Sequence, residues 1–408
     1  MRILFFADNF PPEVNAPATH IYERSRIWVE QGHDVTVITC VPNFPGGTVH
    51  EGYRNALRQV EIVDGIRVVR VWTFIAPNRG TLRRSLDYIS FVPSALVASL
   101  IETRPDVIIS SSPHLMVPVA GVACSTLRRV PHVFELRDLW PASMAAAGAL
   151  REGSVMRMLE RLERLLYRRS RRVLSFTESF REDLVARGTA EEKIDVIYGG
   201  ASDSVRSPDS PRDRDLEEEL NLQDRFVVGY IGTLGLAHGL ENAIDAMATL
   251  KDQPVSLLLV GDGAEKPRLE DRARAAELSN VQFVDLQPKD QLARYWSMCD
   301  AALVHLKDDP VFATVVPSKI FEAMSCGKPI IFAGPVGEAS RLIARHEVGV
   351  IVPAMAPAAL AEAINGLAKD EIRHLRLAEN SAAAAANYTR SKQAERTLEV
   401  LAKAVSQR

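Results

Sequence analysis

Short, continuously apolar runs alternate with segments of helical periodicity along the whole chain, and this alternation limits the possible folds more than any other feature. Continuous apolar runs are typical of strands that are buried on both faces of a sheet. Strands that alternate with helices predict parallel sheets with right-handed crossovers, and therefore an α/β fold. The predicted strands are Ile3–Phe6, Val35–Thr39, Ile66–Trp72, Val107–Ser110, His132–Leu136, Arg172–Phe176, Ile194–Tyr198, Phe226–Ile231, Ser256–Val260, Val281–Val284, Ala301–Val304, Pro329–Ala333 and Gly349–Val352.

The predicted strands form two series, separated by the polar stretch Gly199–Asp224, which is rich in Ser, Pro, Asp, Arg and Glu. This composition predicts a linker with a polar lead-in, and hence two doubly wound α/β domains of similar size. The chain of 408 residues is also longer than the ~250–300 residues at which a single core stops growing. We expect a first domain at residues 1–200, a second at 201–385, and a C-terminal helix within 386–408 that could pack on either domain.

Composition excludes several classes of protein. The net charge of −3 argues against a general nucleic-acid binder, which needs a basic surface. The four cysteines are far apart and lie in or beside apolar stretches, which predicts buried free thiols in a reducing, cytoplasmic compartment and no metal site. Val107–Leu127 has no formal charge, but its prolines and serines favour a strand, a loop and a helix over a membrane span.

Ligands of open α/β sheets bind at the carboxyl ends of the strands, so two such domains face to face would form a central cleft. In the second half, the strand Phe226–Ile231 leads into a glycine-rich turn and a predicted helix, Leu240–Leu250. Such a turn presents backbone N–H groups and a positive helix end to a phosphate, although it could be a plain tight turn. A second glycine-bearing loop, Gly261–Gly263, follows the next strand.

The most informative stretch is Val316–Ile330, in which Pro317 suits the first turn of a helix and Gly327 suits its end. Lys319 would lie in the first turn, where a cation opposes the helix dipole unless an anion is bound there. Glu322 would lie one turn later, where a carboxylate can accept two hydrogen bonds from a diol. The alternative is a surface lysine and a solvated glutamate.

Polar loops also follow the strands of the first half. The loop after Phe6 contains Asn15 and Ala16 and precedes a predicted helix, Thr19–Gln31. His114 follows the fourth predicted strand, away from any apolar helical face, which favours a role in the site over a structural one. Asp138 follows the fifth, where a carboxylate can orient a hydroxyl or can simply pair with Arg137.

Nearly the whole chain, including these loops, resembles the family-4 glycosyltransferases. Members of that family have the GT-B fold of two Rossmann-like domains. The resemblance rests on several short motifs taken together: Pro11–Glu13, Gly32–Val35, Gly232–Gly239, Gly261–Gly263, Asn280-Val281, Cys299–Ala301, and Pro317–Lys319 through Glu322 to Pro329. Arg137–Pro141 and Gly232–Ala237 further resemble the branch that includes O-antigen and capsule fucosamine transferases.

The resemblance implies a retaining, metal-independent transfer of a sugar from a UDP-sugar to a lipid-linked or saccharide acceptor in cell-surface polysaccharide synthesis, without a cofactor. The implied donor sugar is an N-acetylated hexosamine or deoxyhexosamine. His114, Lys319 and Asp138 would serve catalysis, and Asn15, Ala16 and Asp138 the acceptor. The donor would contact Gly232, Thr233, Leu234, Gly235, His238, Gly261, Leu286, Pro317, Ser318, Lys319 and Glu322, with Glu322 on the ribose.

The sequence departs from the family pattern at several positions. The family has a pair of glutamates eight positions apart, but Thr314 replaces the first and only Glu322 remains. Thr233 and His238 replace an arginine and a lysine of the diphosphate loop, so more of the leaving group's charge would fall on Lys319. Two alternatives therefore stay open, a sugar-nucleotide 2-epimerase of the same fold and a catalytically silent sugar-nucleotide-binding subunit.

Two basic segments suggest a peripheral contact with an anionic membrane on the cytoplasmic side. Arg151–Arg172 holds eight Arg and three Glu and has an apolar helical face. In Arg79–Leu100, Arg79, Arg83 and Arg84 precede a second apolar helical stretch. Basic residues beside an apolar face suit interfacial binding, although the first segment could be an ordinary helix with a solvated basic face.

Overall fold

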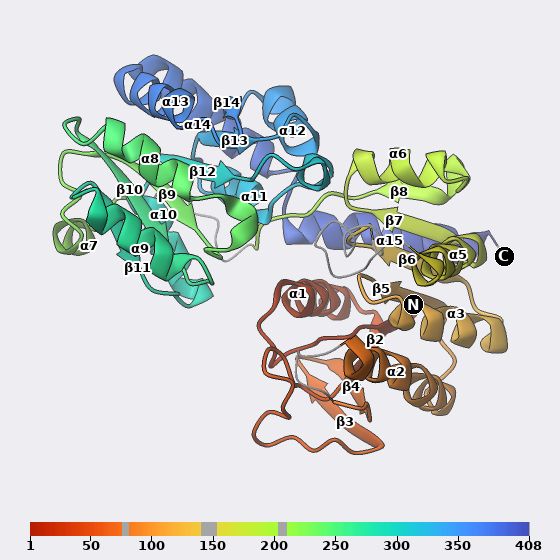
Figure 1. Ribbon diagram of the computed structural model, residues 1–408. Coiled ribbons are helices and arrows are strands. Elements are labelled where there is room, and N and C mark those ends of the chain that lie inside the picture. Colours follow the sequence, from red (N-terminus) through yellow and green to blue (C-terminus); the bar gives the residue numbers. More distant parts are fainter. Residues whose placement is uncertain (76–80, 140–152, 203–209, 408) are drawn as a thin grey trace. The chain divides into compact units, whose positions relative to one another are not determined.

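The computed structural model describes residues 1–75, 81–139, 153–202 and 210–407, and the chain divides into two compact units (Figure 1). The first unit consists of Met1–Tyr198 and Arg390–Arg408, and the second of Gly199–Thr389. The C-terminal helix, whose partner domain the sequence left open, groups with the first unit. The unit boundaries fall after residues 198 and 389, whereas the sequence placed the domain boundaries after 200 and 385.

The first unit is built on an eight-stranded sheet, counted over the described residues, with the order β3-β4-β2-β1-β5-β6-β7-β8. All neighbouring strands are parallel except β3 and β4. The strands are β1 (Arg2–Phe6), β2 (Asp34–Cys40), β3 (Arg58–Val63), β4 (Ile66–Val71), β5 (Val107–Ser111), β6 (His132–Leu136), β7 (Arg172–Ser175) and β8 (Ile194–Val196).

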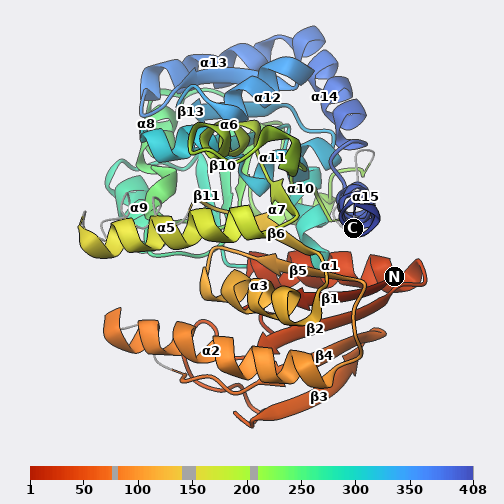
Figure 2. The same ribbon diagram turned by 90° about the vertical axis from the view of Figure 1, so that its right-hand side faces the viewer.

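Helices cover both faces of this sheet (Figure 2), because alternate residues of the central strands are apolar on both sides. Ile3 and Phe5 of β1 pack with α1 (Ala16–Glu30) and α15 (Arg390–Ser406). Leu4 and Phe6 pack with α2 (Thr81–Ile101) and α3 (Met116–Arg128). The remaining helices that the structure describes in this unit are α5 (Ser154–Arg169), α6 (Glu178–Ala186) and the 3-10 turn η1 (Glu191–Lys193).

The C-terminal helix α15 completes the core of the first unit. Ala394 and Leu401 are buried in the same cluster as Trp28 of α1. The Trp28 indole Nε1 donates a hydrogen bond to the Ala394 carbonyl oxygen at 3.0 Å. The chain therefore ends by returning to the unit in which it begins.

The second unit contains a six-stranded sheet in its described residues, entirely parallel, with the order β11-β10-β9-β12-β13-β14. Its strands are β9 (Phe226–Ile231), β10 (Val255–Val260), β11 (Val281–Val284), β12 (Ala301–His305), β13 (Ile330–Gly334) and β14 (Gly349–Pro353). Its helices are α7 (Arg214–Glu219), α8 (Glu241–Thr249), α9 (Lys266–Ala275), α10 (Leu292–Met298), α11 (Ser318–Ser325), α12 (Glu338–His346), α13 (Pro357–Lys369) and α14 (Glu371–Ala385), with 3-10 turns η3 (Leu236–His238), η4 (Lys289–Gln291) and η5 (Pro310–Thr314).

Two elements differ from the sequence prediction. The antiparallel edge strand β3 was not predicted; it joins β4 through Asp64 and Gly65, whose φ values of 47° and 80° suit a two-residue hairpin turn. The short helix α7 lies in the stretch that was predicted to be a linker, capped by the Asp213 carboxylate, which accepts a hydrogen bond from Leu216 N at 3.0 Å. Both elements are polar, so no apolar run marks them.

The sequence predicted that no segment spans a membrane and that the cysteines are buried. No helix in the described residues is long and apolar enough to cross a membrane. All four cysteines are buried, and none of them forms a disulfide bond. Burial raises the pKa of the Cys299 thiol to about 12, so this thiol stays protonated at neutral pH.

Candidate functional site

The glycine-rich loop after β9 begins with Gly232, whose φ of 138° lies in the region that favours glycine. The Lys319 side chain lies against this residue: a Cβ on Gly232 would be 2.7 Å from Cε and 2.8 Å from Nζ of Lys319. Lys319 Nζ also lies 4.8 Å from the ring centroid of Tyr230, within cation–π range. The absence of a side chain at Gly232 thus leaves room for the lysine to reach the loop.

Alternate backbone amides of this loop donate hydrogen bonds within the protein. The Gly232 amide donates to the carbonyl oxygen of Val260, the last residue of β10, at 2.8 Å, and the Leu234 amide to that of Asp262 in the following loop at 2.9 Å. Across the described ranges, the amides of Thr233 and Gly235 donate to no protein acceptor. Two N–H groups in the loop that contacts Lys319 are therefore available to an anion.

The backbone of the loop Gly261–Gly263 packs directly against the backbone of the Gly232 loop. Gly261 and Gly263 have φ values of 148° and 158°. A Cβ on Gly261 would lie 2.0 Å from the carbonyl oxygen of Gly232, and one on Gly263 would lie 2.3 Å from that of Leu234. Only glycine allows the two backbones to approach so closely, which explains why this motif accompanies the first loop.

Helix α11 presents the predicted lysine and glutamate at its first turns. Pro317 is the N-cap residue, one position before the first turn in which the sequence placed it, and the exposed Ser318 is the first helical residue. Lys319 follows, and Glu322, one turn later, is half-buried, which disfavours the alternative of a solvated surface glutamate. The helix ends before Gly327, whose φ is 63°, in agreement with the predicted stop signal.

The electrostatics of the loop differ between its two basic side chains. Burial and the charge of Lys319 lower the pKa of His238 to about 4, so this imidazole is neutral at pH 7. Burial also lowers the pKa of Lys319, and the Glu322 carboxylate opposes that effect. His238 therefore supplies no positive charge in place of the lysine that the family pattern has there.

Two further positions that the sequence analysis singled out in the second unit are Leu286 and Thr314. Leu286 lies in the loop after β11 with 70% of its side chain exposed. Thr314 ends η5, and its hydroxyl donates to the Val311 carbonyl oxygen at 2.9 Å, so it closes its own turn. Tyr230, which the sequence analysis missed, is buried beneath the Gly232 loop and donates its hydroxyl to the Thr233 carbonyl oxygen at 2.7 Å.

In the first unit, Asn15 and Glu13 of the loop after β1 have structural roles. Asn15 is the N-cap of α1, and its Oδ1 accepts a hydrogen bond from Ala18 N at 2.9 Å. The helix consequently begins at Ala16, three residues before its predicted start. The buried carboxylate of Glu13 accepts hydrogen bonds from backbone amides of the loop after β2, at 3.0 and 2.8 Å, and so ties the two loops together.

His114 and Asp138 lie at the carboxyl ends of the adjacent strands β5 and β6. Each is three residues beyond the paired positions Ser111 and Glu135. His114 is buried, and its ring is perpendicular to that of Tyr88 of α2, with 3.7 Å between the ring centroids. Asp138 is half-buried. The last two residues of the predicted motif, at positions 140 and 141, lie outside the described residues.

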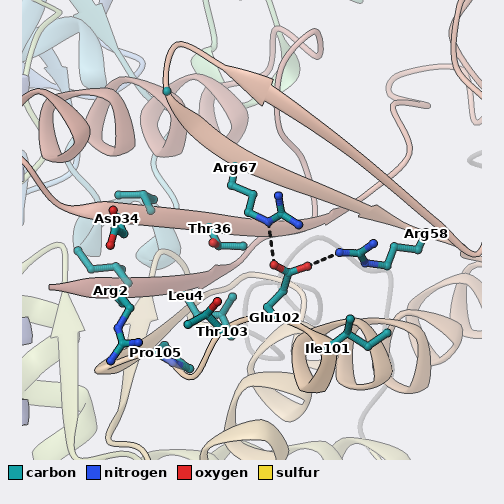
Figure 3. Close-up of a pocket in the computed structure, with 13 residues that line it drawn as sticks. Arg2, Leu4, Asp34, Thr36, Arg58, Arg67, Ile101, Glu102, Thr103 and Pro105 are labelled. Carbon is teal, nitrogen blue, oxygen red and sulfur yellow. Dashed lines mark hydrogen bonds and ion pairs between the residues drawn. The ribbon is translucent and has the colours of Figure 1, made fainter.

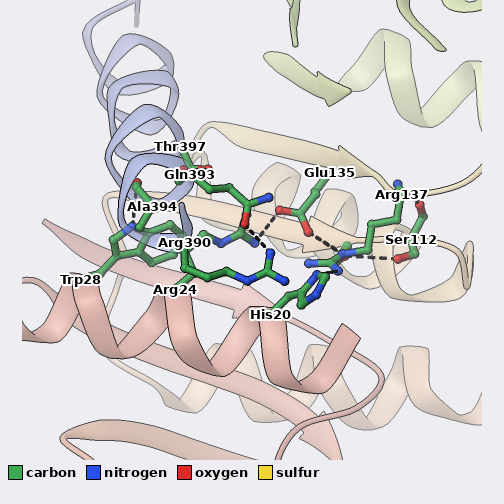
Figure 4. Close-up of polar contacts among 11 residues, drawn as sticks. His20, Arg24, Trp28, Ser112, Glu135, Arg137, Arg390, Gln393, Ala394 and Thr397 are labelled. Atoms are coloured by element: carbon green, nitrogen blue, oxygen red, sulfur yellow. Dashed lines mark hydrogen bonds and ion pairs between the residues drawn. The ribbon is translucent and has the colours of Figure 1, made fainter. Parts of the chain in front are cut away.

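Figure 4 shows a buried group of charges that Arg24, Glu135 and Arg137 form in the first unit. Glu135 is fully buried, with Arg24 Nη2 at 2.5 Å and Arg137 Nε at 2.8 Å. Burial alone would raise the pKa of Glu135, but the two arginines hold it at about 2. Arg137 thus pairs with Glu135, and not with Asp138 as in the alternative that the sequence left open. Arg24 was missed, although it lies on the same helical face as the apolar Ile21 and Trp28, a visible signal of a buried charge.

A cavity of about 570 Å³ lies at the opposite edge of the first sheet (Figure 3). Arg2 and Asp34, which begin β1 and β2, line it, together with Glu102 between Arg58 and Arg67. At this edge of the sheet, Glu102 pairs with Arg58 and Arg67, and Arg2 pairs with Asp106 at 3.5 Å. This is not the edge at which open α/β sheets bind their ligands.

No group of three or more His, Cys, Asp or Glu side chains that could hold a metal ion occurs in the part of the chain that the structure describes. Most of the residues that the sequence predicted for the donor lie on two loops and one helix end in the second unit, whereas Leu286 lies on a third loop, after β11. Those predicted for catalysis and for the acceptor in the first unit lie on loops after β1, β5 and β6.

Comparisons with known proteins agree with this arrangement. The profile of the "Glycosyl transferase 4-like domain" matches residues 15–200, and that of "Glycosyl transferases group 1" matches residues 211–384. The chain is 30% identical over 336 residues, covering 80% of its length and 82% of the other, to WcaI of Escherichia coli K12, whose name assigns it to colanic acid biosynthesis.

Two solved structures share the fold along their whole length. Anabaena HepE in complex with UDP superposes with a TM-score of 0.73 at 20% identity, covering 99% of this chain and 100% of HepE. Sucrose-phosphate synthase from Thermosynechococcus elongatus superposes with a TM-score of 0.77 at 20% identity, covering 100% of both chains.

Proposed function

This chain is a glycosyltransferase of the group 1 (GT4) family with the GT-B fold, and we propose that it transfers a sugar, with retention of configuration, from a UDP-sugar to a lipid-linked or saccharide acceptor. The observation that carries this proposal is the convergence of Lys319, the two available amides of the Gly232 loop and the first turn of α11. Together they form a cradle for a diphosphate in the second unit.

The donor is proposed to be a UDP-sugar. HepE, which shares the fold, has been solved with UDP and with UDP-glucose. In the present chain the diphosphate would lie at the Gly232 loop, the ribose hydroxyls at Glu322, and the base beside the exposed Leu286. A half-buried carboxylate one turn into α11 can accept hydrogen bonds from both hydroxyls of a diol.

The proposed chemistry stabilises the leaving UDP with fixed dipoles and a cation, on the same principle as an oxyanion hole. Lys319, the amides of the Gly232 loop and the end of α11 would supply this stabilisation. An oxocarbenium-like centre then forms, and the acceptor hydroxyl attacks from the side of the leaving group. The departing phosphate oxygen takes the proton of that hydroxyl, and His114 supports the donor sugar.

The biological process is proposed to be cell-surface polysaccharide synthesis, on the basis of the similarity to WcaI. We place the chain beside the fucosamine transferases of O-antigen and capsule, because Arg137–Pro141 and Gly232–Ala237 resemble that branch. The donor sugar would then be an N-acetylated hexosamine or deoxyhexosamine. The acceptor would bind at the loops after β1, β5 and β6, which carry Asn15, Ala16 and Asp138.

A lipid-linked acceptor lies at a membrane, and two helices of the first unit suit docking on an anionic lipid surface. On α2, Leu86, Ile89, Val97, Leu100 and Ile101 form an exposed apolar stripe, with exposures from 47% to 63%. The helix carries no charged residue after Asp87. An apolar stripe of this kind on a helix that cannot span a bilayer suits interfacial binding.

Helix α5 adds the positive charge that the α2 stripe lacks. Val155, Met158 and Leu165 are exposed on it, as are Arg157, Arg161, Arg164 and Arg168. Each cation near an anionic leaflet contributes about 1 kcal/mol. Of the basic residues that suggested this contact in the sequence, Arg79, Arg151 and the side chain of Arg84 lie outside the described residues.

The test is incubation with a panel of UDP-sugars, with and without lipid-linked saccharide acceptors, followed by mass spectrometry and a free-UDP assay. A transferase releases UDP in proportion to an acceptor product with a larger mass. A 2-epimerase converts or hydrolyses the UDP-sugar without an acceptor product. A silent binding subunit binds UDP without turnover. Either of the last two results would overturn the proposal.

A further inference from the structure

The group of Arg24, Glu135 and Arg137, here called the arginine cluster, contains more positive than negative charge. Within the described residues, Glu135 is the one ion-pair partner of both arginines. The other polar contacts of Arg137 are with Ser111 Oγ at 2.6 Å and His20 Nδ1 at 3.4 Å, and neither of these is a carboxylate.

The two arginines are held in different ways. Arg24 is 2% exposed and lies over the rings of Phe5 and Trp28, at 5.3 and 5.2 Å from their centroids. Its contact with Glu135 is the shorter one, 2.5 Å against 2.8 Å for Arg137. One carboxylate is therefore shared by two guanidinium groups, and the arginine cluster keeps one positive charge that Glu135 does not balance.

An uncompensated charge in a mostly buried position is costly, so a structure keeps one where a ligand or a partner balances it. The neighbouring Arg390 does not share in this excess, because Glu23 pairs with it at 3.1 Å. The Arg137 side chain is 11% exposed, so its guanidinium is within reach of a ligand. Its Nε is occupied by Ser111 and Glu135, which fixes the plane of the group. Nη1 has only the 3.4 Å contact with His20 Nδ1, and Nη2 has no protein partner among the described residues, so this end of the guanidinium is left for a ligand.

The position of Arg137 connects the cluster to the acceptor site. Ser111 is the last residue of β5, and Arg137 follows directly after β6. His114 and Asp138 lie on the same two loops. The excess positive charge therefore lies at the carboxyl edge of the first sheet, where the proposed acceptor would bind.

We propose that Arg137 binds an anionic group of the acceptor, either a phosphate of a lipid-linked saccharide or the carboxylate of an acidic sugar. Arg24 is a positioning residue that neutralises Glu135, so that Glu135 orients Arg137 without cancelling its charge. A planar guanidinium fits both anions through paired hydrogen bonds. This inference rests on the proposed transferase function, because it assigns the anion to the acceptor.

The experiment measures anion binding to the full chain saturated with UDP, so that the diphosphate loop is already occupied. Inorganic pyrophosphate and methyl glucuronide are titrated separately by calorimetry. Wild type should bind one of them at one site, and the probe that binds identifies the source of the anion. Arg137→Gln should weaken this binding about ten- to a hundredfold, as expected for loss of a charge-assisted pair, and Arg137→Lys should weaken it less.

Two sets of variants separate binding from folding. Arg26→Gln, which removes an exposed arginine of the same helix as Arg24, should bind the probe like wild type. Arg24→Gln should weaken anion binding, and Arg24→Lys should restore most of it, since lysine also neutralises Glu135. Near-ultraviolet circular dichroism confirms that each variant is folded.

Equal binding by wild type and a folded Arg137→Gln would overturn the proposal, and so would a failure of wild type to bind either anion. If Arg137→Gln does not fold, the affinity of Arg137→Lys decides, and equality with wild type is again the contradicting result. None of these measurements requires turnover. A failure of the transferase assay therefore remains distinguishable from a failure of this inference.

Discussion

Lys319 is the residue on which the proposed chemistry depends most. It lies against Gly232, at a loop where His238 is neutral and supplies no positive charge. Lys319→Ala should therefore lower the turnover number by about ten- to a thousandfold, the scale of losing one donor that stabilises a developing charge. Lys369→Ala, an exposed lysine at the end of α13, is the matched control and should retain full turnover. Near-wild-type turnover in Lys319→Ala would remove this residue from the mechanism.

Glu322 is proposed to bind the ribose rather than to act on the transferring sugar. Glu322→Gln removes a charged acceptor of two hydroxyl groups, so UDP binding should weaken by roughly 1–3 kcal/mol. Calorimetry with UDP measures this, and Glu362→Gln on the exposed face of α13 serves as the control. Unchanged affinity in Glu322→Gln would show that the residue does not contact the nucleotide.

Glu163 of α5 gives the first unit a dependence of stability on pH. Burial raises the pKa of this carboxyl to about 7, and it accepts a hydrogen bond from the Tyr167 hydroxyl at 2.6 Å. The unfolded chain loses this proton near the ordinary value of 4.5, whereas the folded chain keeps it up to about pH 7. The free energy of unfolding should therefore fall across this interval, because the unfolded state releases the proton first.

Glu163→Gln cannot titrate, so its melting temperature relative to wild type should rise between pH 4.5 and 7 and stay constant above. Over the same interval, the free energy of unfolding of Glu163→Gln relative to wild type should rise by on the order of 1–3 kcal/mol. Thermal unfolding of both proteins across this range is the measurement. A difference between the two melting temperatures that does not change with pH would show that Glu163 ionises normally in the folded state.

At the scale of elements, the sequence predicted what hydrophobic burial controls. All thirteen predicted strands occur, because each is an apolar run buried in a sheet. Edge strand β3 and helix α7 were missed because neither is a continuous apolar run.

For the site, motifs predicted which loops carry function, but not that Arg24 pairs with Glu135 or that Tyr230 underlies the Gly232 loop. Arg24 and Glu135 are far apart in the chain, and Tyr230 lies inside the apolar run of β9, so no local pattern marks either contact.

Membrane docking through α2 and α5 is a property of helical faces and should respond to single changes on them. Ile89→Glu with Val97→Glu places charges on the exposed stripe of α2, and Arg161→Glu with Arg164→Glu reverses the charge of α5. Each pair should reduce co-sedimentation with anionic vesicles about tenfold or more at low salt. Wild-type binding should fade as salt is added.

The matched control for docking is Ile372→Glu, which adds a charge at an exposed apolar position of α14 in the second unit. It should bind vesicles like wild type. Changing Arg79, Arg83 and Arg84 to Glu tests the basic segment that precedes and begins α2. No binding of wild type to anionic vesicles at low salt would contradict docking, and the enzyme would then have to find its acceptor through the acceptor itself or a protein partner.

At the scale of the whole molecule, the return of the chain to its first unit links the stability of that unit to the last seventeen helical residues. Helix α15 is a 17-residue helix whose Ala394, Val400, Leu401 and Ala404 are buried with strands β1, β2 and β5 and with Trp28. The first unit therefore lacks part of its core until residues 390–406 have been synthesised. The second unit has a core of its own, formed by its sheet with α8 and α13.

Leu401→Ala should consequently destabilise one unit and leave the other unchanged. Truncating a fully buried leucine costs about 2–5 kcal/mol through lost burial and the cavity left behind. Hydrogen exchange should become faster in β1 and α1, whereas exchange in β9 and β10 and the affinity for UDP should match wild type. Glu399→Ala, two positions away on the exposed side of the same helix, should change neither. Equally accelerated exchange in both units would show that they unfold together, and that α15 supports the molecule as a whole rather than the first unit alone.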